Sequence, residues 1–250
     1  MINSVIVAVK EKSEDLESSF KQMYGAVSII QISNEEAEGI CSKYNLGIIQ
    51  ALSKSKEGWI IFAHDDAILK SGNPSEELNK LENFGADVIG VAGNCKIPKL
   101  SPGYWWSGIT ETGFRGSGAV VHRTPSLQNV FHIESYGPYP QQVAALDGIW
   151  MAVKASCLAD DENLRFEGSF PGYHYYDADF CATARSRGYK IWVADLLFLH
   201  DKWGKGVEDP SFLQHQELFL NKWKRQMHLY YLNQPKLSVN SFINSTGAMQ

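Results

Sequence analysis

The sequence predicts an α/β fold with a mostly parallel central sheet and helices on both of its faces. Short apolar segments alternate with segments of helical periodicity through the first 95 residues, as they do in repeated β-α-β units. Crossovers of that kind leave neighbouring strands parallel. The chain has 250 residues, of which 44% are hydrophobic and 20% are charged, so it can bury the core that such a sheet requires.

The first half is expected to hold four strands and three helices. The strands are expected at 4–9, 27–32, 59–63 and 87–92, and the helices at 13–23, 35–53 and 74–84. Apolar residues that recur every three or four positions predict the helices, as Leu16, Phe20 and Met23 do in the first one. No GxGxxG follows the first strand and no GxxxxGK[ST] occurs, which argues against a dinucleotide oxidoreductase and a P-loop NTPase.

The second half begins with an irregular segment, 94–118, that is rich in glycine, proline and aromatic residues. Trp105 and Trp106 lie in it and are suited to stack on a sugar ring, although a hydrophobic plug under the loop would use the same residues. Beyond it, strands are expected at 118–122, 128–134, 149–154, 191–195 and 196–200, and helices at 177–188 and 212–232. The first three of these strands are expected to extend the sheet in mixed directions.

Composition limits the partners that this chain can be expected to have. A net charge of −5 argues against a nucleic-acid partner, because nucleic-acid binders are normally basic. The four cysteines are widely spaced and form no CxxC pair, which argues against a zinc site and a disulfide framework. With no apolar run near 20 residues and no signal peptide, a cytoplasmic protein is expected, with peripheral contact to the inner membrane surface left open.

Two acidic residues follow the buried strand at 59–63, where His64, Asp65 and Asp66 stand in succession. In open α/β sheets, ligands bind beyond the carboxyl ends of the strands. Adjacent carboxylates are costly there unless a cation lies between them, and carboxylate oxygens suit hard divalent cations. The segment therefore predicts a metal ion and a phosphate-bearing ligand, while a strand-end turn is the simpler alternative for the two acids.

This segment and several others resemble family 2-like glycosyltransferases of the GT-A fold. His64-Asp65-Asp66 resembles their metal-binding DXD element, with histidine in the first position. The other similar segments, in the family's order, are Asn45-Leu46-Gly47 on a helix, the glycine-containing loop and strand at 146–154, Tyr176-Asp177-Ala178-Asp179 at a helix start, Arg185 to Lys190, and His200. The resemblance covers residues 4–204, and Tyr176 replaces the glutamate that usually precedes the catalytic aspartate.

The resemblance implies transfer of a sugar from a UDP-, dTDP- or GDP-linked donor to a hydroxyl of a saccharide or lipid-linked acceptor. Mn²⁺ or Mg²⁺ is the implied cofactor, with Asp66, His200 and His64 as its ligands, and a histidine ligand favours Mn²⁺. His64 could instead orient Asp66 without touching the ion. Asp65 would bind the donor ribose, or the metal through a water molecule.

Asp177 is the implied general base of an inverting transfer, in which a carboxylate takes the proton of the attacking hydroxyl. As an aspartate at a helix start, it is also expected to cap the helix, and the two roles are compatible. Asp147 is the second candidate for the base. It could instead bind the donor sugar, or serve only as part of an Asp-Gly turn with Gly148.

The remaining site residues are assigned to the donor or to the acceptor. The donor-binding candidates are Val9, Asn45, Asp65, Asp147, Gly148 and Lys205. The acceptor-binding candidates are Trp105, Trp106, His174 and Asp179. His174 could instead reach the donor phosphate or be a surface histidine, and Asp179 could instead be structural. One domain is expected over 1–236, with a nucleotide-binding half (1–95), an acceptor and catalytic half (96–204), a C-terminal helix (205–236) and a polar tail (237–250).

Two other functions remain open at the level of sequence. A metal-dependent nucleotidyltransferase would normally have a glycine-rich loop after its first strand, and the segment 9–13 contains no glycine. A non-catalytic module that binds a nucleotide or sugar would also account for Tyr176 in place of the usual acid.

Overall fold

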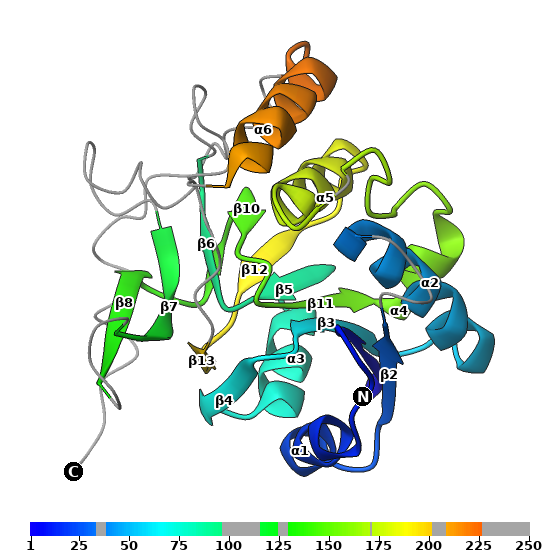
Figure 1. Cartoon of the computed structure of the whole chain (residues 1–250), viewed down its shortest axis with the longest axis vertical. Helices are drawn as coiled ribbons and strands as arrows, with labels where there is room; N and C mark the ends of the chain where they lie inside the picture. The colour runs from blue at the N-terminus through cyan, green and yellow to red at the C-terminus, as the bar shows by residue number, and fades with distance from the viewer. Residues whose placement is uncertain (34–38, 97–115, 125–129, 171, 202–208, 227–250) are drawn as a thin grey trace.

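The computed structural model describes residues 1–33, 39–96, 116–124, 130–170, 172–201 and 209–226 (Figure 1). Six helices are present in these ranges: α1 (Glu14–Tyr24), α2 (Gly39–Lys54), α3 (Pro74–Glu82), α4 (Ala155–Asp160), α5 (Tyr176–Ser186) and α6 (Pro210–Trp223). The strands form two sheets, and the α/β class predicted from the sequence is confirmed.

The larger sheet has seven strands in the order β2-β1-β3-β11-β5-β12-β9. These are β2 (Ser28–Ile32), β1 (Ile2–Ala8), β3 (Trp59–His64), β11 (Trp150–Lys154), β5 (Val88–Gly90), β12 (Ile191–Val193) and β9 (Gln141–Gln142). Strand β11 lies between β3 and β5 and is antiparallel to both. The sheet is thus mixed rather than mostly parallel, because a strand from the second half enters its centre instead of its edge.

The smaller sheet runs in the order β10-β6-β7-β13-β4, with β8 paired to β7. Its strands are β10 (Ala145–Leu146), β6 (Ala92–Asn94), β7 (Gly116–Arg123), β13 (Leu197–His200), β4 (Ala67–Ser71) and β8 (Phe131–Gly137). Six chain segments pass directly from one sheet to the other within the described residues, since β3 leads into β4, β5 into β6, β8 into β9, β9 into β10, β10 into β11 and β12 into β13. The strand predicted at 87–92 is therefore two strands, divided at Val91.

Helices cover both faces of the larger sheet, with α1 and α3 below it and α2 and α5 above it in Figure 1. The helix starts follow local chemistry. The hydroxyl of Ser13 accepts a hydrogen bond from the backbone N–H of Leu16 at α1, and Asn73 caps α3, whose first residue is Pro74. Strands β4, β9 and β10 and helix α4 were not predicted, because each is too short or too exposed to show a clear period.

One continuous hydrophobic core includes buried residues from both halves of the chain, such as Ile61 of β3 and Phe180 of α5. The predicted division into halves at residue 95 stays a prediction. Trp105, Trp106, Lys205 and the tail at 237–250 lie outside the described residues. Within the described ranges, no helix combines the length and the apolar character needed to cross a bilayer.

Candidate active site

The site lies where the two sheets join. Strand β3 ends at His64, and the turn at Asp65 and Asp66 carries the chain into β4. Strand β13 pairs with β4 in the register that sets His200 opposite Ala67. This pairing brings His200, more than 130 residues further along the chain, beside His64 and Asp66. All three residues are predicted metal ligands.

His64, Asp66 and His200 form a cluster that we call the metal-ligand triad. One ligand atom of each lies within 4.8 Å of the others. Nδ1 of His64 is 3.5 Å from Nε2 of His200, and the same Nε2 is 3.7 Å from a carboxylate oxygen of Asp66. Two imidazoles and a carboxylate suit a divalent transition metal. Burial, followed by the nearby His200, lowers the pKa of His64 and favours the neutral form that binds metals.

Tyr176, the first residue of α5, orients His64. Its hydroxyl lies 2.6 Å from Nε2 of His64. Nδ1 of His64 faces His200, and with a metal ion bound at Nδ1 the neutral ring would carry its proton on Nε2 and donate it to the tyrosine oxygen. Gly148 makes room for this contact, since a Cβ there would lie only 1.9 Å from the Tyr176 hydroxyl oxygen. The two departures from the family's pattern, His64 and Tyr176, thus contact each other.

Tyr176→Phe is expected to weaken Mn²⁺ binding by about 10- to 100-fold, because the partner that fixes the tautomer of a ligand histidine is lost. Calorimetric titration of the metal-free protein measures this. Tyr24→Phe is the matched control, since it also removes a buried tyrosine hydroxyl, one that accepts a hydrogen bond from Trp150. Equal Mn²⁺ affinity in the two variants would show that Tyr176 has no part in orienting His64.

Asp177 lies in the first turn of α5, and its side chain accepts hydrogen bonds from the backbone N–H groups of Gly148 and Ala178. Burial, with a second contribution from the Asp147 carboxylate, raises the pKa of Asp177 from 3.8 to about 7. A carboxylate with that pKa is suited to take a proton near neutral pH. Contrary to the sequence prediction, Asp177 is not the N-cap of α5, because that position is Tyr175 and Asp177 is the second residue of the helix.

Asp147 is half-buried on the same loop and accepts a hydrogen bond from the backbone N–H of Ile149 at 2.8 Å. Its own N–H donates to Ala92, which fixes the loop to β6. The structure therefore brings Asp147, Gly148 and Asp177 together, close to the Tyr176 hydroxyl that contacts the triad.

Residues 9–228 match the profile described as "Glycosyltransferase like family". The chain belongs to this family. The predicted enzyme class, a glycosyltransferase, is thereby confirmed. No curated protein sequence matches the chain significantly.

A solved structure shows the same fold for this glycosyltransferase. GalNAc-T7, crystallised with UDP, GalNAc and Mn²⁺, superposes with a TM-score of 0.54 at 10% identity, over 90% of this chain and 48% of that one. The glycosyltransferase thus spans about half the length of GalNAc-T7. A197 from STIV is similar over 77% of this chain and 81% of its own, at 10% identity and a TM-score of 0.48.

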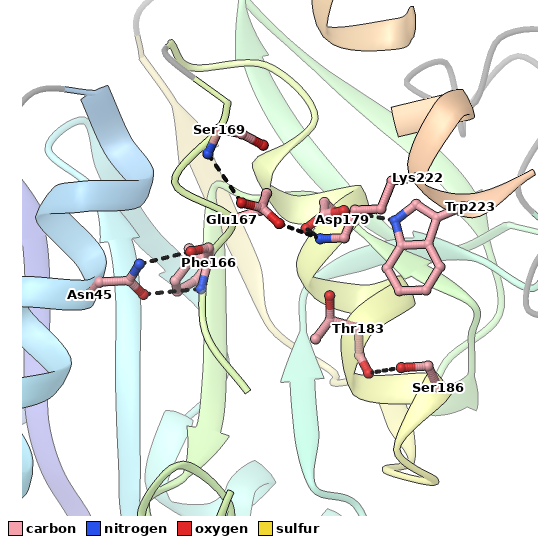
Figure 2. A network of polar contacts seen from close by, with 9 residues as sticks. All are labelled: Asn45, Phe166, Glu167, Ser169, Asp179, Thr183, Ser186, Lys222 and Trp223. Carbon is pink, nitrogen blue, oxygen red and sulfur yellow. Dashed lines mark hydrogen bonds and ion pairs between the residues drawn. The ribbon is translucent and has the colours of Figure 1, made fainter. Parts of the chain in front are cut away.

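The helix that carries the Asn-x-Gly motif of the glycosyltransferase is tied to the loop after α4. The side-chain amide of Asn45 donates to the carbonyl of Phe166 at 2.8 Å and accepts from its N–H at 3.0 Å (Figure 2). Gly47 lies against β1, where a Cβ would come 2.4 Å from a methyl group of Ile6. The side-chain amide of Asn45, predicted to bind the donor, therefore makes hydrogen bonds to the backbone of Phe166 and positions α2.

Near the end of β1, Val9 is buried, and its carbonyl accepts a hydrogen bond from Nζ of Lys43 at 3.2 Å. Lys43 is fully buried on α2 and also contacts the hydroxyl of Tyr173. A buried lysine at the predicted nucleotide end of the sheet was not anticipated. Lys43 lies on the same helix face as the apolar residues Ile40 and Tyr44, and a lysine on such a face is the sequence feature that indicates it is buried.

Asp179 links α5 to α6 in the glycosyltransferase. Its side chain is fully buried and accepts hydrogen bonds from Lys222 at 2.9 Å and from the indole N–H of Trp223 at 2.7 Å (Figure 2). Lys222 also reaches Glu167 at 3.0 Å. Both of its oxygens are used and its side chain is buried, so Asp179 has the structural role that was one of its two predicted roles, and its acceptor contact stays a prediction.

Asp179→Ala is expected to lower the free energy of unfolding by about 2–3 kcal/mol, because the Trp223 N–H loses its acceptor in a buried position. Urea denaturation measures the change. Glu167→Ala removes the exposed partner of the same lysine and should cost less than about 1 kcal/mol. Similar losses in both variants would contradict a structural role that is specific to Asp179.

His174 lies just before α5, with Nε2 3.5 Å from a carboxylate oxygen of Asp209, which caps the start of α6. Its ring contacts Phe212 and His215 of α6. The residue after it, Tyr175, has a left-handed backbone with φ of 63°, a conformation that costs energy in a non-glycine residue. His174 stands next to the segment that presents Tyr176 and Asp177, so its predicted acceptor role remains a proposal.

Proposed function

We propose that this enzyme transfers a sugar from a UDP-, dTDP- or GDP-linked donor to a hydroxyl of a saccharide or lipid-linked acceptor, with inversion at the anomeric carbon. The observation that supports this most strongly is the position of Asp177. The Asp177 carboxylate, with a pKa near 7, accepts a hydrogen bond from the Gly148 N–H. The Tyr176 hydroxyl lies against the same glycine and contacts His64 of the triad. A proton acceptor and a residue that contacts the candidate metal site therefore both lie against the Gly148 loop.

In the proposed reaction, Asp177 takes the proton of the acceptor hydroxyl as its oxygen attacks the anomeric carbon. The bond from that carbon to the donor diphosphate breaks, and the nucleoside diphosphate leaves. A backbone N–H and the first turn of α5 hold the carboxylate in place during the transfer. Burial, and after it the charge of Asp147, keeps the pKa of Asp177 high, so the base is both available near pH 7 and strong enough to take a proton.

The triad would hold Mn²⁺ or Mg²⁺, and its imidazoles favour Mn²⁺. A divalent cation bound there supplies positive charge to the leaving diphosphate. Tyr176 keeps the ring of His64 in the orientation that faces the triad. Asp65 is half-buried on the turn beside these residues, where it is proposed to bind the donor ribose.

A thermal-shift screen of nucleotide sugars, each with and without Mn²⁺, tests the proposed donor class. One nucleotide class should raise the melting temperature only when Mn²⁺ is present, because a ligand that binds the folded state stabilises it. Asp66→Ala should abolish that shift. If no nucleotide sugar changes the melting temperature under either condition, the proposed donor class is wrong.

The transfer rate should rise with pH through a midpoint near 7, because Asp177 must lose its proton before it can act as a base. Below the midpoint the rate should fall about tenfold per pH unit. Asp147→Asn should move the midpoint to lower pH, since it removes a negative charge that raises the pKa of Asp177. A pH–rate profile with donor and metal at saturation measures both effects, and an unchanged midpoint in the variant would contradict the assignment.

A further inference from the structure

Strand β8 forms an outer edge of the smaller sheet. Among the described residues it pairs only with β7, and Figure 1 shows it beyond β7 at the left of the molecule. Its register with β7 is regular from Phe131 to Ser135, and the irregularity in this pairing comes after Ser135. A regular edge strand is a template for pairing with a further strand.

The backbone groups of alternate residues in β8 point away from β7. The N–H of Thr124 donates to the carbonyl of Val130 at 2.8 Å, so these two residues belong to a hydrogen-bonded pair of the ladder. In an antiparallel ladder, the residues between two such pairs direct their N–H and C=O groups outward. The residues of β8 in that position are Phe131, Ile133 and Ser135.

The two faces of β8 at this edge differ in chemistry. The side chains of Phe131 and Ile133 are 44% and 63% exposed, and they project from one face because the residues are two positions apart. His132 and Glu134 are also exposed and project from the opposite face. One face of the edge is therefore apolar, and the other carries a hydrogen-bond donor and a carboxylate.

A two-fold axis at Ile133 makes this edge complementary to itself. Two copies of a strand related by such an axis run antiparallel, as in an isologous interface. Ile133 then lies opposite its own copy, and its outward N–H and C=O groups pair with those of the partner. His132 lies opposite the partner's Glu134, and Glu134 opposite the partner's His132. An axis at His132 or at Glu134 would instead set two like groups opposite each other, so charge favours the register centred on Ile133.

We propose that β8 pairs with β8 of a second copy of this chain, antiparallel about Ile133, and joins the smaller sheets of the two molecules. The hydroxyl of Thr124 lies 3.4 Å from Nδ1 of His132, where it can donate to that nitrogen and leave the Nε2–H for the partner's Glu134. On the other face, Ile133 packs against its own copy with Phe131 beside it, which removes exposed apolar surface from water. The inference does not depend on sugar transfer.

Sedimentation velocity of the full chain over a series of concentrations tests this proposal. The wild type should pass from monomer to dimer as the concentration rises. Ile133→Lys should raise the dimer dissociation constant at least about tenfold, because it sets two ammonium groups opposite each other at the axis. Ile49→Lys is the matched control, since Ile49 is an isoleucine of α2 that is 64% exposed, and it should dimerise as the wild type does.

A pair of charge variants tests the register itself. His132→Glu sets two carboxylates opposite each other, and Glu134→Lys sets a lysine opposite a histidine, so each variant should dimerise more weakly than the wild type. An equimolar mixture of the two should dimerise more strongly than either variant alone. In the mixed dimer, the introduced glutamate lies opposite the introduced lysine, and a native His132 lies opposite a native Glu134.

These variants should keep the melting temperature of the monomer, because all three substituted residues of β8 are exposed. The proposal is overturned if the wild type stays monomeric at every concentration, including the case in which it gains mass only on lipid vesicles. It is also overturned if Ile133→Lys dimerises as Ile49→Lys does, or if the mixture of charge variants associates no more strongly than its components.

Discussion

Asp177→Asn is expected to lower the transfer rate by about 10²- to 10⁴-fold, the usual contribution of a general base. Donor binding should stay close to that of the wild type, because the asparagine carbonyl can still accept the hydrogen bond from the Gly148 N–H. Steady-state rates with saturating donor and metal measure the first effect, and calorimetric donor binding measures the second. Asp15→Asn, an exposed aspartate in the first turn of α1, is the control.

The same variant should be more stable than the wild type above pH 7. The carboxyl of Asp177 ionises near 3.8 in the unfolded chain and near 7 in the folded one, so its ionisation opposes folding as the pH rises between these values. Asparagine removes this cost of a few kcal/mol. A loss of transfer together with a gain of stability at pH 8 would identify Asp177 as a group held in place for its chemistry. Transfer near the wild-type rate would move the base elsewhere, with Asp147 as the next candidate.

Asp66→Ala is expected to weaken Mn²⁺ binding at least 100-fold, because it removes the only carboxylate of the metal-ligand triad. Metal-dependent donor binding and transfer should be lost with it. The side chain of Asp66 is only 6% exposed, so the fold of the variant should be checked by circular dichroism. Calorimetric titration with Mn²⁺ measures the affinity.

Asp65→Ala is the matched control for this change, since Asp65 is the adjacent acid and is not a member of the triad. Its Mn²⁺ affinity should be close to that of the wild type, while its donor affinity should fall. If Asp66→Ala binds Mn²⁺ as the wild type does, the triad is not the metal site.

The sequence predicts this site well where local pattern and order along the chain suffice. His64 and Asp66 follow an apolar strand, and His200 follows another, so their meeting at the sheet rim follows from the fold. The contact between Tyr176 and His64 could not be predicted in this way. It depends on the left-handed turn before α5 and on the space beside Gly148, and neither appears in a residue pattern.

The predictions for Asn45 and Asp179 show a different limit. Both residues belong to motifs that resemble the family's. Yet Asn45 makes hydrogen bonds to Phe166, and Asp179 accepts hydrogen bonds from α6. A motif indicates that a polar side chain is needed at a position, but the partner is set by tertiary packing. The entry of β11 into the centre of the sheet is similar, because apolar periodicity shows that a strand is buried and does not show its neighbours.

Acceptor-dependent release of nucleoside diphosphate by the metal-stripped enzyme, before and after addition of Mn²⁺, tests the central claim most directly. The donor is the nucleotide sugar found in the thermal-shift screen, offered with a panel of saccharide and lipid-linked acceptors. We expect little release without metal, and a rate that Mn²⁺ restores in the wild type but not in Asp66→Ala. Release that is equally fast with and without metal would contradict the role given to His64, Asp66 and His200.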